Sequence, residues 1–452
     1  MVNPKSDEFE VFNLLSKLVA LETVNDPQNQ RTPKPESLEL VQSFFEASGL
    51  TIEIRQFNSF SSQRASLGVG RPHVLILGHL DVVPFIESQW KTDPMMLARS
   101  RENPAIAFGR GAHDDKGGVT AMLLAARRLA PQISSGTVSF LVTTDEEVGG
   151  GYGAGAWASY LKEINQTPDF VINTDGGVDM KLVGRRRGVF AVEVRVPRKE
   201  VIVRGLVESL EFDTSIIGEP TLHAAYFRPG SDRHALLAAS KVVQKEDLFV
   251  RTLDGSFLKG NVIPNQVTLQ VVRPYNEGDE HTVDLNLTKL VCLLGRASRL
   301  FWNEENQSEY GINITPNVLN NTDEGSRVRF DVRTFCTDEE RIRHEFESCF
   351  KAIEGTTVAI GFGGGLFFTP FSSPLLQSAT DVANKLGLNP TVIEQEGASD
   401  SRFFASEGIP CVELAPRGGN IHSPNEWVDL DTIACVSRFY EILTLHLLRQ
   451  QS

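Results

Sequence analysis

The sequence contains no long hydrophobic run and few cysteines. None of its apolar stretches approaches the ~18 residues that a membrane-spanning helix needs. The opening segment MVNPKSDEFEVF has no basic stretch followed by an apolar one, so we expect no secretory signal. The five cysteines are widely spaced and form no CxxC pair. Free thiols in a reducing compartment fit this pattern, which predicts a cytoplasmic protein.

The sequence also has too few basic residues to balance its acidic ones. It contains 44 Lys and Arg against 58 Asp and Glu, for a net charge of −14. An acidic surface repels nucleic-acid phosphates and anionic lipid headgroups, so we expect neither nucleic acid nor a membrane as a partner. We interpret the short basic run at residues 185–187 as a solvated turn between two elements.

Length and patterning indicate more than one domain, because 452 residues exceed the ~100–200 of an ordinary domain. In the first 184 residues, apolar strand patterns such as HVLILGHL (73–80), TVSFLVTT (137–144) and FVINTD (170–175) alternate with helical patterns. This alternation is typical of an α/β layer with a largely parallel sheet.

The middle of the chain follows a different pattern. Residues 188–196, 266–272 and 327–333 alternate apolar and polar side chains, as strands with one buried face do. The α/β pattern then resumes. We therefore predict one domain made of residues 1–184 and 371–452, and an inserted α+β domain, residues 185–370, built on an antiparallel sheet.

Charged and imidazole side chains follow the predicted strands of the first domain. His79 and Asp81 follow HVLILG, Glu146 and Glu147 follow FLVTT, and Asp175 ends FVINTD. Because ligands gather at the carboxyl ends of parallel strands, we expect these groups to meet at one edge of the sheet.

Two loops add further polar groups. GRGAHDDKGG (109–118) contains Asp114 and Asp115 before a predicted helix, and GGNIHSP (418–424) contains His422. Taken singly, each has a structural explanation, and capping the following helix is the expected task of Asp115. Together, adjacent carboxylates after apolar strands need compensating cations. Imidazole with carboxylate is the ligand set of zinc and similar metals, and its size here predicts two ions.

Six motifs, in this order, resemble one metallopeptidase family. They are HLDVVP (79–84), GRGAHDDKGG (109–118), TTDEEVGG (143–150), NTDGG (173–177), EGASDSRFF (396–404) and GGNIHSPNEWV (418–428). The chain is thus similar to the family of acetylornithine deacetylase and succinyl-diaminopimelate desuccinylase, which includes glutamate carboxypeptidases, aminoacylases and dipeptidases. The resemblance implies a zinc-peptidase-like catalytic domain with a mostly parallel central sheet. It also implies an inserted lid domain through which a homodimer forms.

Five residues match the metal ligands of this family. Asp114 matches the carboxylate that bridges both ions. His79 and Asp175 match the other ligands of one ion, and Glu147 and His422 match those of the second. Zn²⁺ is the expected metal, with Co²⁺ or Mn²⁺ as alternatives.

Two neighbouring carboxylates match catalytic roles. Asp81 matches the residue that orients the ring of His79 and raises its basicity. Glu146 matches the general base that takes a proton from the attacking water and returns it to the leaving amine. The resemblance therefore implies hydrolysis of an amide bond by water that two metal ions activate.

Further residues match positions that contact the substrate. Arg333 matches an arginine of the inserted domain that binds a substrate carboxylate, and an ion pair with Asp331 or another neighbour is the alternative. Arg402 is a second candidate for anion binding, with Ser399 in the same loop.

A histidine of the inserted domain stabilises the tetrahedral oxyanion in this family, often across a dimer interface. Here the pattern departs from the familiar one. His223 matches this position best, and His234 competes with it. The inserted domain is also longer than usual, mainly between Lys241 and Gly311.

The resemblance implies a small carboxylate-bearing substrate, namely an N-acyl amino acid or a short peptide. Deacetylase or desuccinylase activity is the first reading, and dipeptidase or carboxypeptidase activity is the alternative. A non-catalytic relative that binds metal or peptide, and a two-metal phosphoesterase, are remoter alternatives. Phosphoesterases surround phosphate with basic groups, and the resemblance gives no such set around the metals.

Overall fold

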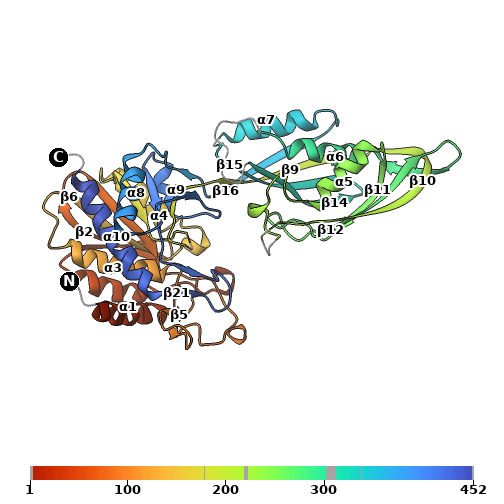
Figure 1. Cartoon of the computed structure of the whole chain (residues 1–452). Coiled ribbons are helices and arrows are strands. Elements are labelled where there is room, and N and C mark those ends of the chain that lie inside the picture. The colour runs from red at the N-terminus through yellow and green to blue at the C-terminus, as the bar shows by residue number, and fades with distance from the viewer. Residues whose placement is uncertain (1–3, 178, 218–221, 302–311, 337, 450–452) are drawn as a thin grey trace. The chain divides into compact units, whose positions relative to one another are not determined.

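The computed structural model describes residues 4–177, 179–217, 222–301, 312–336 and 338–449. They form two compact units (Figure 1). Unit 1 comprises Met1–Arg186, Phe367–Gln395 and Ser399–Ser452, and unit 2 comprises Arg187–Leu366 and Glu396–Ala398. The predicted boundaries after residues 184 and 370 fall within a few residues of these divisions. The return of Glu396–Ala398 to unit 2 was not expected from the sequence.

Unit 1 is built on a nine-stranded sheet in the order β1-β2-β6-β3-β7-β19-β8-β17, with β18 beside β8. The α/β class is as predicted, but the sheet is mixed. Strands β6, β3, β7 and β19 run parallel at its centre, whereas β1, β2, β8 and β17 form antiparallel pairs toward its edges. The strands are β1 (Thr51–Phe57), β2 (Phe60–Val69), β3 (His73–His79), β6 (Gly136–Thr143), β7 (Phe170–Asn173), β8 (Leu182–Arg186), β17 (Phe367–Phe368), β18 (Val392–Glu394) and β19 (Cys411–Glu413).

Helices cover both faces of this sheet, which explains why β3 is apolar without interruption. Val74 and Ile76 belong to the core that contains α1, α2, α3, α8 and α10. Leu75 and Leu77 point to the opposite face and belong to the core that contains α4 and α9. The helices are α1 (Pro4–Val19), α2 (Glu39–Ala47), α3 (Lys116–Leu129), α4 (Ala154–Glu163), α8 (Pro374–Leu386), α9 (Ser401–Ala405) and α10 (Leu430–Arg449).

A small antiparallel sheet joins two distant segments of unit 1. Its strand order is β20-β21-β5-β4. The strands are β4 (Ala98–Arg99), β5 (Ile106–Phe108), β20 (Gly418–Gly419) and β21 (Trp427–Asp429). Pairing of β5 with β21 sets the loop after residue 108 beside the loop before residue 427. These two loops carry predicted metal ligands.

Unit 2 contains two four-stranded antiparallel sheets where the sequence predicted one. The first, β14-β15-β9-β16, contains the strands predicted at residues 188–196 and 327–333. The strand predicted at residues 266–272 belongs to the second sheet. The second, β11-β12-β10-β13, uses much of the added length after Lys241, of which residues 302–311 lie outside the described residues. The strands are β9 (Gly188–Pro197), β10 (Glu200–Asp213), β11 (Phe249–Gly255), β12 (Gln266–Pro274), β13 (Asp279–Asp284), β14 (Asn313–Thr322), β15 (Gly325–Thr334) and β16 (Thr357–Gly364).

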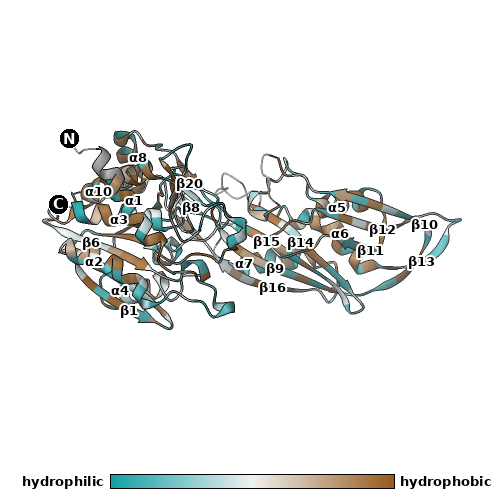
Figure 2. Cartoon of the chain, turned by 90° about the horizontal axis from the view of Figure 1, so that it is seen from below, coloured by the Kyte–Doolittle hydropathy of each residue, from teal (hydrophilic) through white to brown (hydrophobic). Residues whose placement is uncertain are grey.

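The described residues of unit 2 also form the α-helices α5 (Ala235–Lys245), α6 (Leu285–Ala297) and α7 (Glu339–Phe350). Their apolar residues and those of both sheets form one core. In Figure 2, α5 and α6 carry both hydrophobic and hydrophilic segments, as helices with one buried face do.

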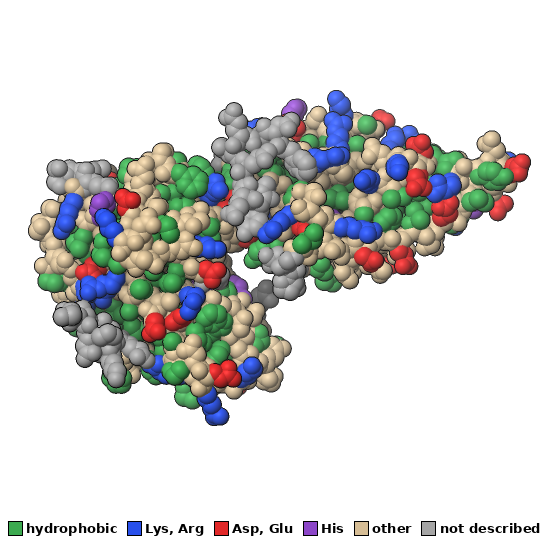
Figure 3. All heavy atoms as spheres, viewed as in Figure 1, with side chains coloured by type: hydrophobic (Ala, Val, Ile, Leu, Met, Phe, Trp, Pro, Cys, Tyr) green, Lys and Arg blue, Asp and Glu red, His purple; other side chains and the backbone are tan. Residues whose placement is uncertain are grey.

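On the face shown in Figure 3, acidic and basic side chains are interspersed rather than gathered into one large patch. Within the described part of the chain, no helix combines the length and apolarity needed to cross a bilayer.

Candidate active site

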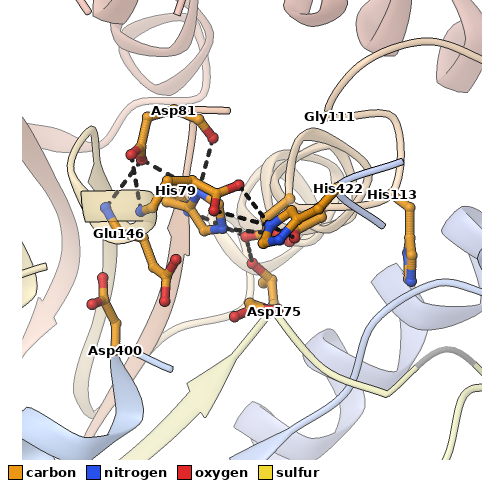
Figure 4. A network of polar contacts seen from close by, with 12 residues as sticks. His79, Asp81, Gly111, His113, Glu146, Asp175, Asp400 and His422 are labelled. Atoms are coloured by element: carbon orange, nitrogen blue, oxygen red, sulfur yellow. Dashed lines mark hydrogen bonds and ion pairs between the residues drawn. The ribbon is translucent and has the colours of Figure 1, made fainter. Parts of the chain in front are cut away.

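The structure brings all five predicted metal ligands together in unit 1 (Figure 4). His79 ends β3, Glu147 lies in the short helix η4 (Glu146–Val148) after β6, and Asp175 follows β7. Asp114 precedes α3, and His422 lies between β20 and β21. The carboxyl ends of the parallel strands therefore supply three of the groups, and two loops supply the others.

The ligands form two groups that share Asp114. His79, Asp114 and Asp175 make one group, and Asp114, Glu147 and His422 make the other, with ligand atoms within 4.8 Å of one another in each. The two oxygens of Asp114 face different imidazoles. Oδ1 lies 3.1 Å from His79 Nε2, and Oδ2 lies 3.2 Å from His422 Nε2. Such a carboxylate is suited to bridge two cations.

The electrostatics of the group also fit cations. Burial, together with repulsion from Asp114, raises the pKa of both Asp175 and Glu147 to about 7. Although burial opposes the shift, hydrogen bonds to Asp114 and Glu147 raise the pKa of His422 to about 11. Without a cation, His422 therefore holds its proton at neutral pH, and Asp175 and Glu147 are partly protonated. Divalent ions would replace the protons and stabilise the ionised carboxylates, so the residues present fit a two-metal centre.

Asp81 is fully buried and connects His79 to the loop of the two glutamates. Its carboxylate lies 3.3 Å from His79 Nδ1 and accepts hydrogen bonds from the backbone N–H groups of Glu146 and Glu147, at 3.2 and 3.1 Å. Asn25 Nδ2 also donates to it, at 2.9 Å. A proton on Nδ1 leaves Nε2 of His79 as the free ligand atom. Asn25 could not be predicted from the sequence, because it is a single polar residue in a loop 56 residues before Asp81.

Glu146 lies beside the ligands without belonging to either group. Burial raises the pKa of its carboxyl well above the usual range, with repulsion from Asp400 and Asp175 adding to the effect. Figure 4 shows its carboxylate facing that of Asp400. No described side chain hydrogen-bonds the Glu146 carboxylate, so in its ionised form it is available to accept a proton.

The prediction that Asp115 caps the following helix is wrong. It occupies the N-cap position of α3, but its side chain makes no capping hydrogen bond. The carboxylate is buried and accepts hydrogen bonds from Thr174 Oγ1, at 2.6 Å, and from the backbone N–H of His79, at 3.1 Å. Asp115 thus links the ends of β3 and β7, a contact between residues too distant in sequence for the motif to indicate.

The interpretation of residues 185–187 as a solvated turn is also wrong. Arg186 ends β8 and is buried, and its guanidinium contacts Glu413 Oε2 at 2.7–2.8 Å. Glu413 Oε1 accepts a hydrogen bond from Ser401, at 2.7 Å, and another from Ser399. Arg187 is buried as well and pairs with Glu396 in unit 2.

The loop of Ser399 and Arg402 is placed in unit 1. Because Ser399 is fully buried and bound to Glu413, its direct contact with substrate stays a prediction that this placement does not favour. Arg402 is partly exposed and donates to the carbonyl of Gly149, at 2.7 Å. Its role in anion binding stays a prediction.

Arg333 lies in unit 2 within a buried ionic cluster. Its Nε donates to Asp331 Oδ1 at 2.8 Å, and its Nη1 lies 3.0 Å from Glu396 Oε2. The ion pair weighed as an alternative is therefore formed. The sequence did not indicate Glu396 or Arg187 as partners, because they come from separate segments of the chain. Binding of a substrate carboxylate by Arg333 stays a prediction.

The two competing histidines of unit 2 differ in exposure. His234 is 2% exposed, and burial lowers its pKa to about 4. His223 is half-buried, and burial with the nearby charge of Arg333 lowers its pKa. His223 Nδ1 accepts a hydrogen bond from Ala225 N, so in the neutral ring Nε2 carries the proton. His234 Nδ1 likewise accepts a hydrogen bond from Leu236 N, so only the greater exposure of the ring favours His223, and the choice between the two stays a prediction.

In this site, two candidate ligand groups share the carboxylate of Asp114 at the edge of an α/β sheet, and Glu146 lies beside them without belonging to either group. This arrangement is that of a metal-dependent hydrolase. The chain belongs to peptidase family M20/M25/M40, whose sequence model matches residues 75–446. The family consists of hydrolases of amide and peptide bonds, and this membership confirms the enzyme class predicted from the motifs.

Curated relatives share about a quarter of their residues with the chain. It is 26% identical over 355 residues to a succinyl-diaminopimelate desuccinylase of Nitratiruptor sp., covering 78% of this chain and 79% of that one. It is 26% identical over 461 residues to the desuccinylase of Xylella fastidiosa, covering 97% and 99%.

Solved structures share the fold at lower identity. An aminoacylhistidine dipeptidase of Vibrio alginolyticus matches with a TM-score of 0.75 and 13% identity, covering 98% of this chain and 97% of that one.

Proposed function

We propose that this protein hydrolyses the amide bond of a small N-acyl amino acid or short peptide at a centre of two Zn²⁺ ions. The observation that carries the proposal is the geometry of Asp114, whose two oxygens face two different imidazoles. Three further carboxylates, Glu146, Glu147 and Asp175, lie around it. Co²⁺ and Mn²⁺ accept the same ligands and are alternatives.

The residues of unit 1 divide the chemical work. Cations held by His79, Asp114, Glu147, Asp175 and His422 would supply polarisation of the scissile carbonyl and would acidify a water molecule. Glu146 accepts the proton from the attacking water and delivers it to the leaving nitrogen. Asp81 keeps the His79 ring and the Glu146 backbone in position through its hydrogen bonds.

Residues outside the metal ligands select and stabilise the substrate in this proposal. His223 donates its Nε2–H to the developing oxyanion, which the bond from Ala225 N to Nδ1 supports. Arg333 and Arg402 are the proposed partners of a substrate carboxylate, with Ser399 in the loop of Arg402.

An N-succinyl or N-acetyl amino acid is the first substrate class, because desuccinylases match the chain over most of its length. A dipeptide is the second, because the aminoacylhistidine dipeptidase shares the fold of the whole chain. We further propose a homodimer formed through unit 2 and a cytoplasmic location, with no nucleic-acid or membrane partner. Sedimentation of the purified protein tests the first of these.

A substrate panel tests the proposal. The metal-free protein is supplied with Zn²⁺, Co²⁺ or Mn²⁺ and assayed on N-succinyl amino acids, N-acetyl amino acids and dipeptides. We expect hydrolysis of one class, its loss on chelation and its return with added metal. Two bound ions without hydrolysis of any class would make the protein a binding relative instead. Hydrolysis that survives complete metal removal would contradict the two-metal centre.

A further inference from the structure

The loops of Asp114 and His422 are joined at their base by main-chain pairing. Trp427 of β21 pairs with Phe108 of β5, and the N–H of Gly109 donates to the carbonyl of Glu426 at 3.1 Å. Beyond this point the two segments separate, one toward Asp114 and the other toward His422. Backbone pairing therefore ends just before the ligands.

The side chain of Glu426 continues the connection where the backbone pairing stops. It is fully buried and accepts four hydrogen bonds from the loop of Asp114. Oε1 accepts from the N–H groups of His113 and Asp114, at 2.9 and 3.0 Å. Oε2 accepts from the N–H of Gly111, at 3.0 Å, and from Arg110 Nη1, at 2.6 Å. One carboxylate thus holds the backbone on both sides of residue 112, up to the bridging aspartate itself (Figure 4 shows Gly111 and His113 on this loop).

Arg110 makes the reciprocal connection. Its Nη1 binds Glu426, and its Nη2 donates to the carbonyl of Ser423, the residue after His422, at 3.3 Å. The ring of Trp90 lies 5.1 Å from the guanidinium and limits its movement. Arg110 is 2% exposed, so water competes little for these bonds.

The loop of His422 needs such support because of its backbone. His422 has φ of +57°, and Asn420 and Asn425 have +57° and +60°. Left-handed conformations at residues other than glycine cost on the order of 1–3 kcal/mol each and persist when the surroundings hold them. The bond from Arg110 to Ser423 acts directly beside the strained histidine.

We propose that Arg110 and Glu426 are positioning residues that set the distance between Asp114 and His422 and so preorganise the metal centre. The inference rests on the proposed function, since it assigns the pair a purpose only if Asp114 and His422 bind metal. Glu426 holds the bridging ligand, which serves both ions. Arg110 holds the loop of His422, which serves one ion.

The conservative variant Glu426→Gln tests whether Glu426 positions the loop of Asp114. Its amide has a single acceptor oxygen, and its NH₂ group would face donors that now point at a carboxylate. Partners of metal ligands typically contribute 10–100-fold to metal affinity. We expect both Zn²⁺ binding steps, measured by chelator competition on the full chain, to weaken by about 10–100-fold.

Glu441→Gln is the matched control. Glu441 is also a buried carboxylate of unit 1 and lies 2.6 Å from an arginine, Arg128, but it touches no ligand loop. Both variants are expected to lower the melting temperature of the metal-free protein. Only Glu426→Gln is expected to weaken metal binding. If the two variants bind Zn²⁺ with equal affinity, Glu426 contributes only to the stability of the fold, and the proposal is wrong.

Arg110→Lys tests whether Arg110 positions the loop of His422. It also tests the proposal independently if Glu426→Gln does not fold. Lysine keeps a charge for Glu426 but lacks the planar fork that reaches Ser423 as well. We expect one Zn²⁺ binding step to weaken by about 10-fold or more and the other to change little. Two unchanged steps would contradict the proposal. If the unaltered protein shows no two-step binding, the proposed function itself is wrong.

Discussion

Each of the two units buries a cluster of charged side chains, and the two clusters are balanced differently. In unit 2, the guanidinium groups of Arg187 and Arg333 lie against the carboxylates of Asp331 and Glu396. In unit 1, the carboxylates of the ligand groups and Glu146 outnumber the two imidazoles. No described lysine or arginine side chain hydrogen-bonds a carboxylate of these ligand groups.

The difference shows in the proton affinities. Burial and repulsion hold the pKa of Asp175 and Glu147 near 7. In the unit 2 cluster, guanidinium groups compensate the charge of the carboxylates. In the buried unit 1 cluster, ionised carboxylates would need bound cations to compensate their charge. The excess of acidic groups, and not the presence of charge, is therefore what supports the proposal that the unit 1 cluster binds metal.

The largest expected effect comes from Glu146, the carboxylate of the unit 1 cluster that belongs to neither candidate ligand group. Glu146→Ala should lower turnover by about 10²–10⁴-fold, because the proton acceptor is lost. Metal content, measured by elemental analysis, should stay at two ions. Metal loss in proportion to the loss of activity would assign Glu146 a ligand role. Glu146 would then no longer differ from Glu147 and Asp175 in its role.

Breaking the balance in unit 2 should destabilise the protein. Arg333→Met leaves Asp331 and Glu396 with one guanidinium fewer, and removing one partner of a buried pair costs about 3–5 kcal/mol. The loss is measured by urea unfolding. Arg195→Met is the control, because Arg195 pairs with Glu193 at the surface and should contribute only about 0–1 kcal/mol. A stable Arg333→Met protein whose KM alone rises would favour substrate binding over ionic balance.

The histidines of unit 2 provide the next test. His223→Ala should lower turnover by about 10²–10³-fold with metal content unchanged, since a donor to the oxyanion is lost. His234→Ala should leave turnover nearly unchanged in the folded protein and lower its melting temperature, because His234 is buried in the core. Exchanged results would make His234 the oxyanion donor.

The final test concerns pH. Because the pKa of Asp175 and Glu147 lies near 7 without metal, a cation must displace protons below that pH. Zn²⁺ affinity should thus fall as pH decreases from 7 to 5.5, by about tenfold per pH unit for each displaced proton. Chelator competition at several pH values measures this. Affinity that is constant over the range would show that the carboxylates are ionised before metal binds.

The five proposed metal ligands could be selected from the sequence because each ends a strand or stands in a short motif, and the structure groups them. His79 and Asp175 were placed at the edge of the sheet by strand polarity alone. Family membership and the α/β class were predicted for the same reason, and both are confirmed.

Residues that act through distant partners were beyond the reach of the sequence. Asn25, Glu426 and Arg187 each bind a charged side chain that lies 56 or more residues away in the sequence, namely Asp81, Arg110 and Glu396. Asp115 was misassigned because its position suggested a cap, while its carboxylate binds Thr174, 59 residues on. The second sheet of unit 2 was missed because β10 and β13 carry few buried apolar residues to reveal their period.

The short return of Glu396–Ala398 to unit 2 has a consequence for how this chain can be divided. A fragment covering Arg187–Leu366 would omit Glu396, the acid that Arg187 and Arg333 share. Unit 2 therefore does not correspond to one continuous segment of the sequence that could be transferred to another protein by itself. Transplanting it intact would also require Glu396–Ala398, which the unit 1 segment Phe367–Gln395 separates from the rest of the insertion.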